Sequence, residues 1–97
     1  MIRHVVLWTF ADAVPAAERD AILDAVRALK GVVPSLRALE VGPNVSPARA
    51  HGYTHVLLET FDDPAGLAAY AAHPDHVPVL ARLREAAAQL LAVDLEV

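Results

Sequence analysis

Four segments of the chain have the composition and alternation of β-strands. Residues 2–10 (IRHVVLWTF) and 53–61 (YTHVLLETF) are rich in β-branched and aromatic residues and contain no glycine or proline, which is typical of strands. Residues 36–41 and 90–97 alternate apolar and polar positions, as half-buried strands do. Both faces of residues 2–10 carry bulky apolar side chains, so we expect both faces of that strand to be covered.

Two helices are predicted between these strands. In residues 16–30 the apolar positions recur three and four apart, with charged residues on the other side, which predicts an amphipathic helix. A second helix is expected after Asp63, a residue type that caps exposed amides, with a proline at the first helical position. It covers residues 64–72, is interrupted at residues 73–76 (HPDH) and continues over about residues 77–88.

The resulting order, β-α-β-β-α-β, predicts a single α+β domain over residues 1–97. Its topology is ferredoxin-like, with an antiparallel four-stranded sheet and helices on one face. The opposite face would carry Val5, Leu7, Val56 and Leu58, which are too apolar to face water. A second copy of the sheet is the simplest cover. We therefore expect a homodimer through sheet-to-sheet packing, which closes a dimeric α+β barrel.

Composition narrows the possible functions. The 97 residues are 56% hydrophobic but only 5% aromatic, which is more apolar surface than one small core hides and favours a subunit interface. The absence of cysteine excludes disulfides and a cysteine nucleophile. A net charge of −4 without any Lys/Arg run argues against nucleic acid as a partner. No segment has the length of a membrane span, and the opening residues lack a cleavage site, so we expect a cytoplasmic protein.

Two histidines lie on the predicted strands. His4 shares a strand face with Val6 and Trp8, and His55 lies on the third strand. Because the first and third strands are neighbours in this topology, we expect His4 and His55 to lie side by side beneath the helices. A histidine on a strand face is also a common core residue, and Trp8 has the alternative interpretation of simple packing.

Tyr70, His73 and His76 lie at the predicted helix break, where side chains can turn inward. A tyrosine and a histidine beside an apolar wall can support acid–base chemistry near neutral pH. The structural alternatives are a core aromatic for Tyr70, turn closure for His73 and helix capping for His76. His73 and His76 have the spacing of a metal pair, but with no cysteine and only scattered carboxylates we expect no metal site.

Several motifs together resemble one family. The opening IRHVVLWTF, the strand GYTHVLLETF, the Y-x-x-H-P-x-H run of Tyr70 to His76 and the closing AVDLEV are similar to the stress-responsive A/B barrel domain (Dabb) family. The resemblance covers essentially the whole chain and implies a dimeric α+β barrel. The family includes a plant stress protein that forms higher oligomers and a plant polyketide cyclase that closes a poly-β-ketone by intramolecular aldol condensation.

The resemblance also implies residue roles. By analogy with the cyclase, His76 removes the proton from a nucleophilic methylene, and Tyr70 hydrogen-bonds the polarised carbonyl. No cofactor is needed, and the ligand is a small apolar or β-keto compound. The remaining pocket residues that the resemblance implies, which bind the substrate or form apolar walls, are His4, His55, Val6 and Trp8.

Two alternatives remain at this point. The first is a non-catalytic, stress-responsive oligomeric barrel in which the same residues only pack. The second is a haem-degrading or quinol-forming monooxygenase, a class that the wider dimeric barrel superfamily contains. The monooxygenase is the weaker alternative, because the sole asparagine, Asn44, falls in a predicted loop.

Overall fold

The computed structural model describes residues 1–97 and has the predicted order of elements. The strands are β1 (Ile2–Phe10), β2 (Ala38–Pro43), β3 (His55–Phe61) and β4 (Ala87–Glu96). The helices are α1 (Ala16–Ala28), α2 (Pro64–Ala72) and α3 (Val77–Ala86), with short 3-10 turns at Leu29–Gly31 and Pro47–Arg49. The fold is a ferredoxin-like α+β fold, as the sequence predicts.

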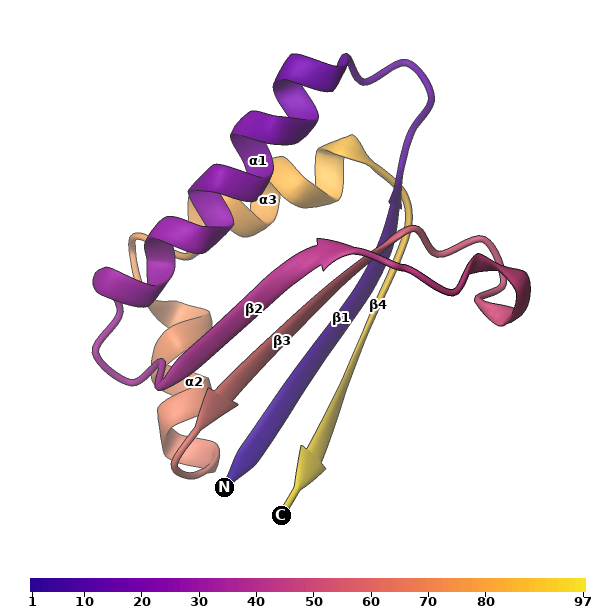
Figure 1. The fold of residues 1–97 in the computed structure, drawn as a ribbon. Coiled ribbons are helices and arrows are strands. Elements are labelled where there is room, and N and C mark those ends of the chain that lie inside the picture. The colour runs from indigo at the N-terminus through magenta and orange to yellow at the C-terminus, as the bar shows by residue number, and fades with distance from the viewer.

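The four strands form one antiparallel sheet in the order β2-β3-β1-β4, and all three helices lie on one face of it (Figure 1). The two ends of the chain lie next to one another, where the amino group of Met1 donates a hydrogen bond to the carbonyl of Val97 at 2.7 Å. Because all three helices lie on the same side, the central strands β1 and β3 present one face to the helices, and their other face is uncovered in a single chain.

The core between sheet and helices consists of two clusters. One lies towards the end of β1 and contains Trp8, Phe10, Ile22, Val26, Leu57 and Leu83. The other lies towards the start of β1 and contains Ile2, Leu29, Val33, Leu36, Phe61 and Tyr70. Side chains from both clusters line the pocket described below, so that pocket lies where the two clusters meet.

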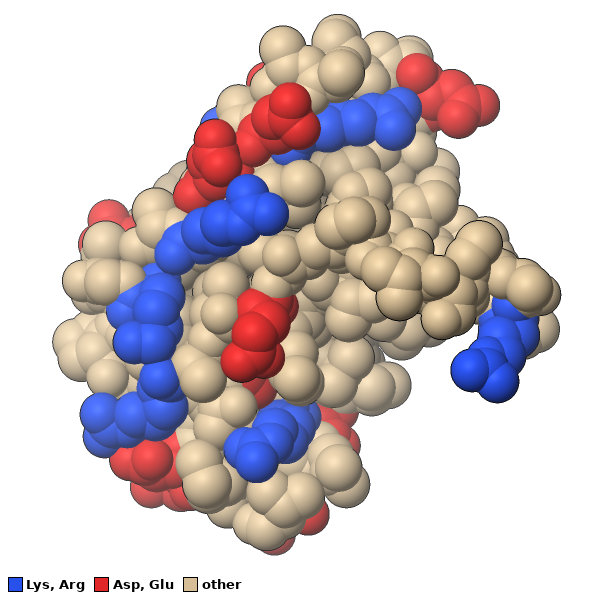
Figure 2. All heavy atoms as spheres, viewed as in Figure 1, with Lys and Arg blue, Asp and Glu red and all other residues tan.

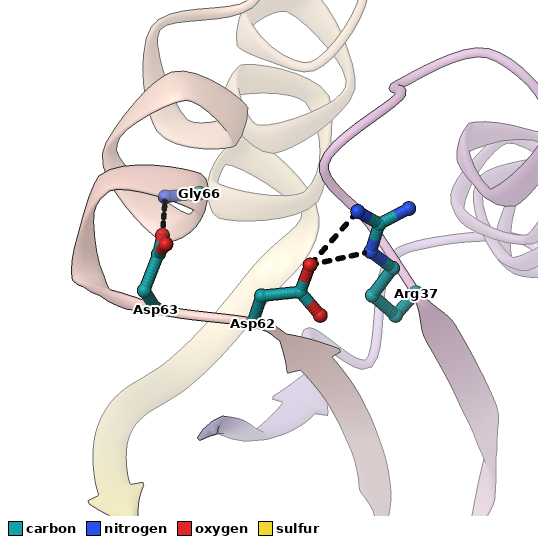
Figure 3. A network of polar contacts seen from close by, with 4 residues as sticks. All are labelled: Arg37, Asp62, Asp63 and Gly66. Carbon is teal, nitrogen blue, oxygen red and sulfur yellow. Dashed lines mark hydrogen bonds and ion pairs between the residues drawn. The ribbon is translucent and has the colours of Figure 1, made fainter.

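The start of α2 is fixed by side-chain contacts (Figure 3). Asp63 accepts a hydrogen bond from the backbone N–H of Gly66 at 2.8 Å, and Pro64 occupies the first helical position, so the predicted cap is confirmed. Beside it, Arg37 donates two hydrogen bonds to one oxygen of Asp62, at 2.8 and 3.0 Å. These contacts hold the β3–α2 corner against the segment that leads into β2.

The bounds of three strands differ from the sequence prediction. β2 begins at Ala38 rather than residue 36, because Leu36 packs into the core before the strand starts. It ends at Pro43 rather than residue 41, because Pro43 still pairs with His55. β3 begins at His55 rather than at residue 53. β4 begins at Ala87, where helical residues were predicted, because Ala87 already pairs with Phe10. Alanine at this junction has no side chain that distinguishes helix from strand by periodicity.

The centre of the uncovered sheet face is apolar. Val5 lies opposite Leu58 on one side and Val93 on the other, and Leu7 lies opposite Leu91. Val93 is 55% exposed in the single chain. On the side seen in Figure 2, acidic and basic side chains both lie over the first half of α1, and basic side chains form a run from its second half downwards. No helix has the length and hydrophobicity that crossing a bilayer requires.

Candidate active site

A pocket of about 220 Å³ lies between the inner face of the sheet and the three helices. Most of its lining is apolar and comes from residues such as Val26, Leu67, Val79 and Leu80. Its polar lining groups are His4, Glu59, Tyr70, His76 and Arg84. An apolar pocket with a few convergent polar groups is the usual form of a small-molecule site.

The helix break places His76 in this pocket. α2 ends at Ala72, Pro74 cannot continue it, and α3 begins at Val77. His76 is only 8% exposed, and its Nδ1 lies 3.2 Å from the carbonyl oxygen of Ala71. Since a carbonyl can only accept, Nδ1 is assigned as the donor and Nε2 as the basic nitrogen. Burial lowers the pKa of His76, with a smaller opposing effect from the Ala71 carbonyl, which favours the neutral imidazole that a general base needs.

The ring of Tyr70 lies against that of His76, with ring centroids 4.1 Å apart, and against that of Phe61, with ring centroids 5.1 Å apart. The tyrosine is 2% exposed. Burial, followed by the nearby Glu59 carboxyl, raises the pKa of Tyr70 far above its ordinary value. The phenol therefore keeps its proton and is available as a hydrogen-bond donor or acid. The predicted pairing of Tyr70 with His76 is present in the structure.

His4 and Val6 also line the pocket, as expected for residues on the inner face of β1. His4 Nδ1 lies 2.5 Å from Oδ1 of Asp94, which is directly opposite on β4. The carboxylate can only accept, so it fixes a proton on Nδ1 and orients the ring.

Glu59 is a site residue that the sequence analysis did not single out. It lies opposite His4 in the β1–β3 pairing, lines the pocket and is 1% exposed. Neither carboxyl oxygen has a partner in hydrogen-bond geometry, although the Tyr70 hydroxyl is close enough to affect its pKa. Burial raises the pKa of Glu59, and Tyr70 and His4 oppose that rise. The alternation of residues along β3 could have identified it, because Glu59 is the one charged residue on the inner face of that strand, between Leu57 and Phe61.

His55 and Trp8 lie outside the pocket lining. The expectation that His4 and His55 lie side by side is wrong. The antiparallel register places Trp8 opposite His55 and Glu59 opposite His4, which separates the two histidines by about 13 Å along the strands. His55 instead stacks on Trp8 at 5.4 Å and is bonded to the Thr54 hydroxyl at 2.8 Å. Burial, and to a smaller extent the charge of Arg19, lowers the pKa of His55.

The remaining histidine of the helix break has a local role. His73 Nδ1 accepts a hydrogen bond from the backbone N–H of Asp75 at 3.1 Å, which closes the turn. No three His, Cys, Asp or Glu side chains come together in an arrangement that would hold a metal ion.

Comparison with known proteins identifies the family. The model of the Stress Responsive A/B Barrel Domain (Dabb) matches residues 2–97. The chain belongs to the Dabb family. Across 77 residues it is 32% identical to the stress-response A/B barrel domain-containing protein HS1 of Arabidopsis thaliana, covering 78% of this chain and 71% of the relative. It is 25% identical to olivetolic acid cyclase of Cannabis sativa over 77 residues, with 78% and 76% coverage.

Solved structures agree with the Dabb assignment. A crystal structure of an Arabidopsis thaliana protein matches with a TM-score of 0.91 at 28% identity, covering 100% of this chain and 95% of the other. A Thermobifida fusca protein described as dimeric and ferredoxin-like matches with a TM-score of 0.85 at 27% identity, covering 99% and 90%. The hydroxynitrile lyase of Passiflora edulis shares the fold, with a TM-score of 0.93 at 20% identity and coverage of 99% and 92%.

Proposed function

We propose that this Dabb protein is an acid–base enzyme that forms an enolate from a small β-keto substrate, and so acts as a lyase or cyclase that needs no cofactor. The observation that carries the proposal is the contact between His76 and Tyr70 inside an apolar pocket. One group is held neutral and basic, and the other is held protonated. Groups whose environments favour opposite roles in this way are typical of acid–base sites.

In the proposed reaction, Nε2 of His76 takes a proton from the methylene between two carbonyl groups. The C–H electron pair moves into the adjacent C–C bond, and the carbonyl oxygen becomes an enolate that accepts a hydrogen bond from Tyr70. The enolate carbon then attacks a second carbonyl, whose oxygen receives the proton from His76. His4, held by Asp94, orients the substrate. The relationship to olivetolic acid cyclase, by name a cyclase, supports this class of reaction.

The size of the pocket limits the part of the substrate that enters it. About 220 Å³ is less than the roughly 300–1,000 Å³ of pockets that enclose drug-sized ligands. We therefore expect a short β-keto segment to be bound inside, with any carrier group left outside.

The proposal is tested by proton exchange. The protein is incubated in D₂O with the acetoacetyl thioester of N-acetylcysteamine, and loss of the methylene proton signal is followed by NMR. We expect exchange above the buffer rate, which His76→Ala abolishes and Tyr70→Phe slows about tenfold or more, as for loss of a hydrogen bond to developing charge. The matched control is His51→Asn, which removes an exposed histidine outside the pocket. Exchange at the buffer rate, or full exchange by His76→Ala, contradicts the proposal.

A second candidate function is a non-catalytic, stress-responsive oligomeric barrel, favoured by the 32% identity to HS1. In that case His76 and Tyr70 only pack, so His76→Ala lowers the melting temperature and no exchange is seen with any variant. The exchange experiment therefore separates the two candidates.

The proposed enzyme is a homodimer formed through sheet-to-sheet packing. The uncovered face carries Val5, Leu7, Leu58 and Leu91, and burial of such a surface is favourable by about 25 cal/mol per Å². Related structures are described as dimeric. The test of this interface is given with the predictions below.

A further inference from the structure

Glu59 is the one ionisable side chain whose buried polar atoms have no partner in hydrogen-bond geometry. It is 1% exposed, and neither of its oxygens has such a partner, although the Tyr70 hydroxyl is near enough to lower its pKa. Leaving a buried polar group unpaired costs about 1–3 kcal/mol, and glutamate is rarely buried without a partner. The neighbours on its strand face, Leu57 and Phe61, show that an apolar residue is compatible with this position.

The place of Glu59 in the pocket suggests what completes its hydrogen bonding. It lies in the pocket wall formed by the sheet, opposite His4 on β1 and near the Tyr70 hydroxyl from α2. The titratable groups that line the same pocket are His4, Tyr70, His76 and Arg84. A polar atom of a ligand held by Tyr70 would therefore also lie near Glu59.

We propose that Glu59 and Tyr70 together form an oxyanion-binding pair, in which the Glu59 carboxyl is the second hydrogen-bond donor to the enolate oxygen. This inference rests on the enolate chemistry proposed above and assigns a catalytic role to Glu59. The ligand class that it predicts has an uncharged carbonyl group that becomes an anionic oxygen when His76 takes the proton.

The charge state of Glu59 decides whether this pair can work. An ionised carboxylate beside the enolate would repel it, whereas a protonated carboxyl donates a hydrogen bond to it. Burial raises the pKa of Glu59, and the arrival of a second negative charge raises it further. A tyrosine next to a carboxyl that an apolar site keeps protonated is a known device for stabilising an oxyanion.

Binding of 4-nitrophenol tests the pair without any turnover, because its phenolate resembles an enolate and absorbs at a different wavelength from the phenol. We expect the wild-type protein to bind the phenolate. Glu59→Leu removes the donor and weakens binding by about ten- to a hundredfold, the range for a hydrogen bond to a charged group. Glu59→Gln retains an N–H donor of similar shape and keeps most of the affinity. Thermal unfolding and the oligomeric state of each variant are measured in parallel, so that a folding defect is recognised.

Three results would overturn the assignment. Unchanged binding by Glu59→Leu means that the carboxyl does not contact the oxyanion. Tighter binding by both variants means that Glu59 is ionised and repels the anion. Loss of proton exchange in Glu59→Gln, with normal exchange in His76→Ala, means that Glu59 is the general base rather than a donor.

The same variants separate this inference from the proposed function. If the protein binds 4-nitrophenolate through Glu59 but shows no exchange with the β-keto thioester, the oxyanion pair stands and the enolate reaction is wrong. If exchange depends on His76 but phenolate binding does not depend on Glu59, the reaction stands and the role of Glu59 is wrong. His51→Asn again serves as the matched control and should leave both measurements unchanged.

Discussion

Replacing Glu59 by leucine should make the protein more stable, although the substitution lies in the proposed active site. In the structure this carboxyl is almost completely buried and neither oxygen is paired. Replacing a poorly satisfied buried charged group by an apolar one of similar volume is often stabilising by about 1–4 kcal/mol. Tyr70 and His4 offset part of the rise in the pKa of Glu59 that burial causes. We therefore expect Glu59→Leu to increase the free energy of unfolding by about 1–3 kcal/mol near pH 8.

The pH dependence of this gain has a definite sign. Because the folded-state pKa of Glu59 is raised above the ordinary 4.5, the folded chain holds a proton that the unfolded chain has already released. The stability due to the protonated carboxyl is complete below about pH 4.5 and is lost as the pH rises through the folded-state pKa. The advantage of Glu59→Leu over wild type should therefore be smallest near pH 4.5 and grow towards pH 8.

The assay is urea unfolding of both proteins at several pH values and one fixed protomer concentration, since the stability of the proposed dimer would depend on concentration. Taking the difference between the two proteins cancels the titration of all other groups. The control is Glu85→Gln, on an exposed position of α3, which should change stability by less than about 0.5 kcal/mol at every pH. A leucine variant that is less stable than wild type at pH 8, or whose advantage does not vary with pH, refutes the reasoning.

Three further perturbations test other parts of the structure. Asp63→Ala removes the hydrogen bond of 2.8 Å that caps the Gly66 N–H and should lower the free energy of unfolding in urea by about 1 kcal/mol. A variant as stable as wild type would show that the cap contributes nothing. Leu91→Asp places a charge on the uncovered sheet face opposite Leu7 and should convert the proposed dimer to monomers in size-exclusion chromatography with light scattering. A variant with the same mass as wild type would contradict the proposed interface. Because burial lowers the pKa of His76 from 6.5, the rate of methylene proton exchange should rise with pH to a plateau, with the midpoint of the rise below pH 6.5. A midpoint above that value would mean that another group is the base.

Local sequence patterns predicted the elements well. The strand at Ile2–Phe10 and the helix at Pro64–Ala72 have the predicted bounds. The ends of the helix are marked by residues with a specific physical effect, the Asp63 cap and the proline in the HPDH break. At the start of β4 the junction is a run of alanines, which have no such effect. The predicted end of the preceding helix, at about residue 88, is therefore wrong.

The contents of the pocket could be predicted only in part. Alternation showed which strand residues share a face, so His4 and Val6 were correctly expected beneath the helices. It did not show the register between β1 and β3, and this is why His55 was expected beside His4, where the structure has Glu59. The burial of Glu59 depends on the helices above the sheet as well as on the register, and neither can be read from a single strand.

In the proposed complex, a carbonyl substrate lies in the pocket with its acidic carbon at His76 and its carbonyl oxygen at Tyr70 and Glu59. This arrangement is tested most directly by a crystal structure of the protein with 4-nitrophenol bound. We predict the phenolate oxygen within hydrogen-bond distance of the Tyr70 hydroxyl and the Glu59 carboxyl, with the ring against the apolar wall of the pocket. A saturated crystal in which the ligand lies elsewhere, or in which its oxygen contacts neither residue, would contradict the account.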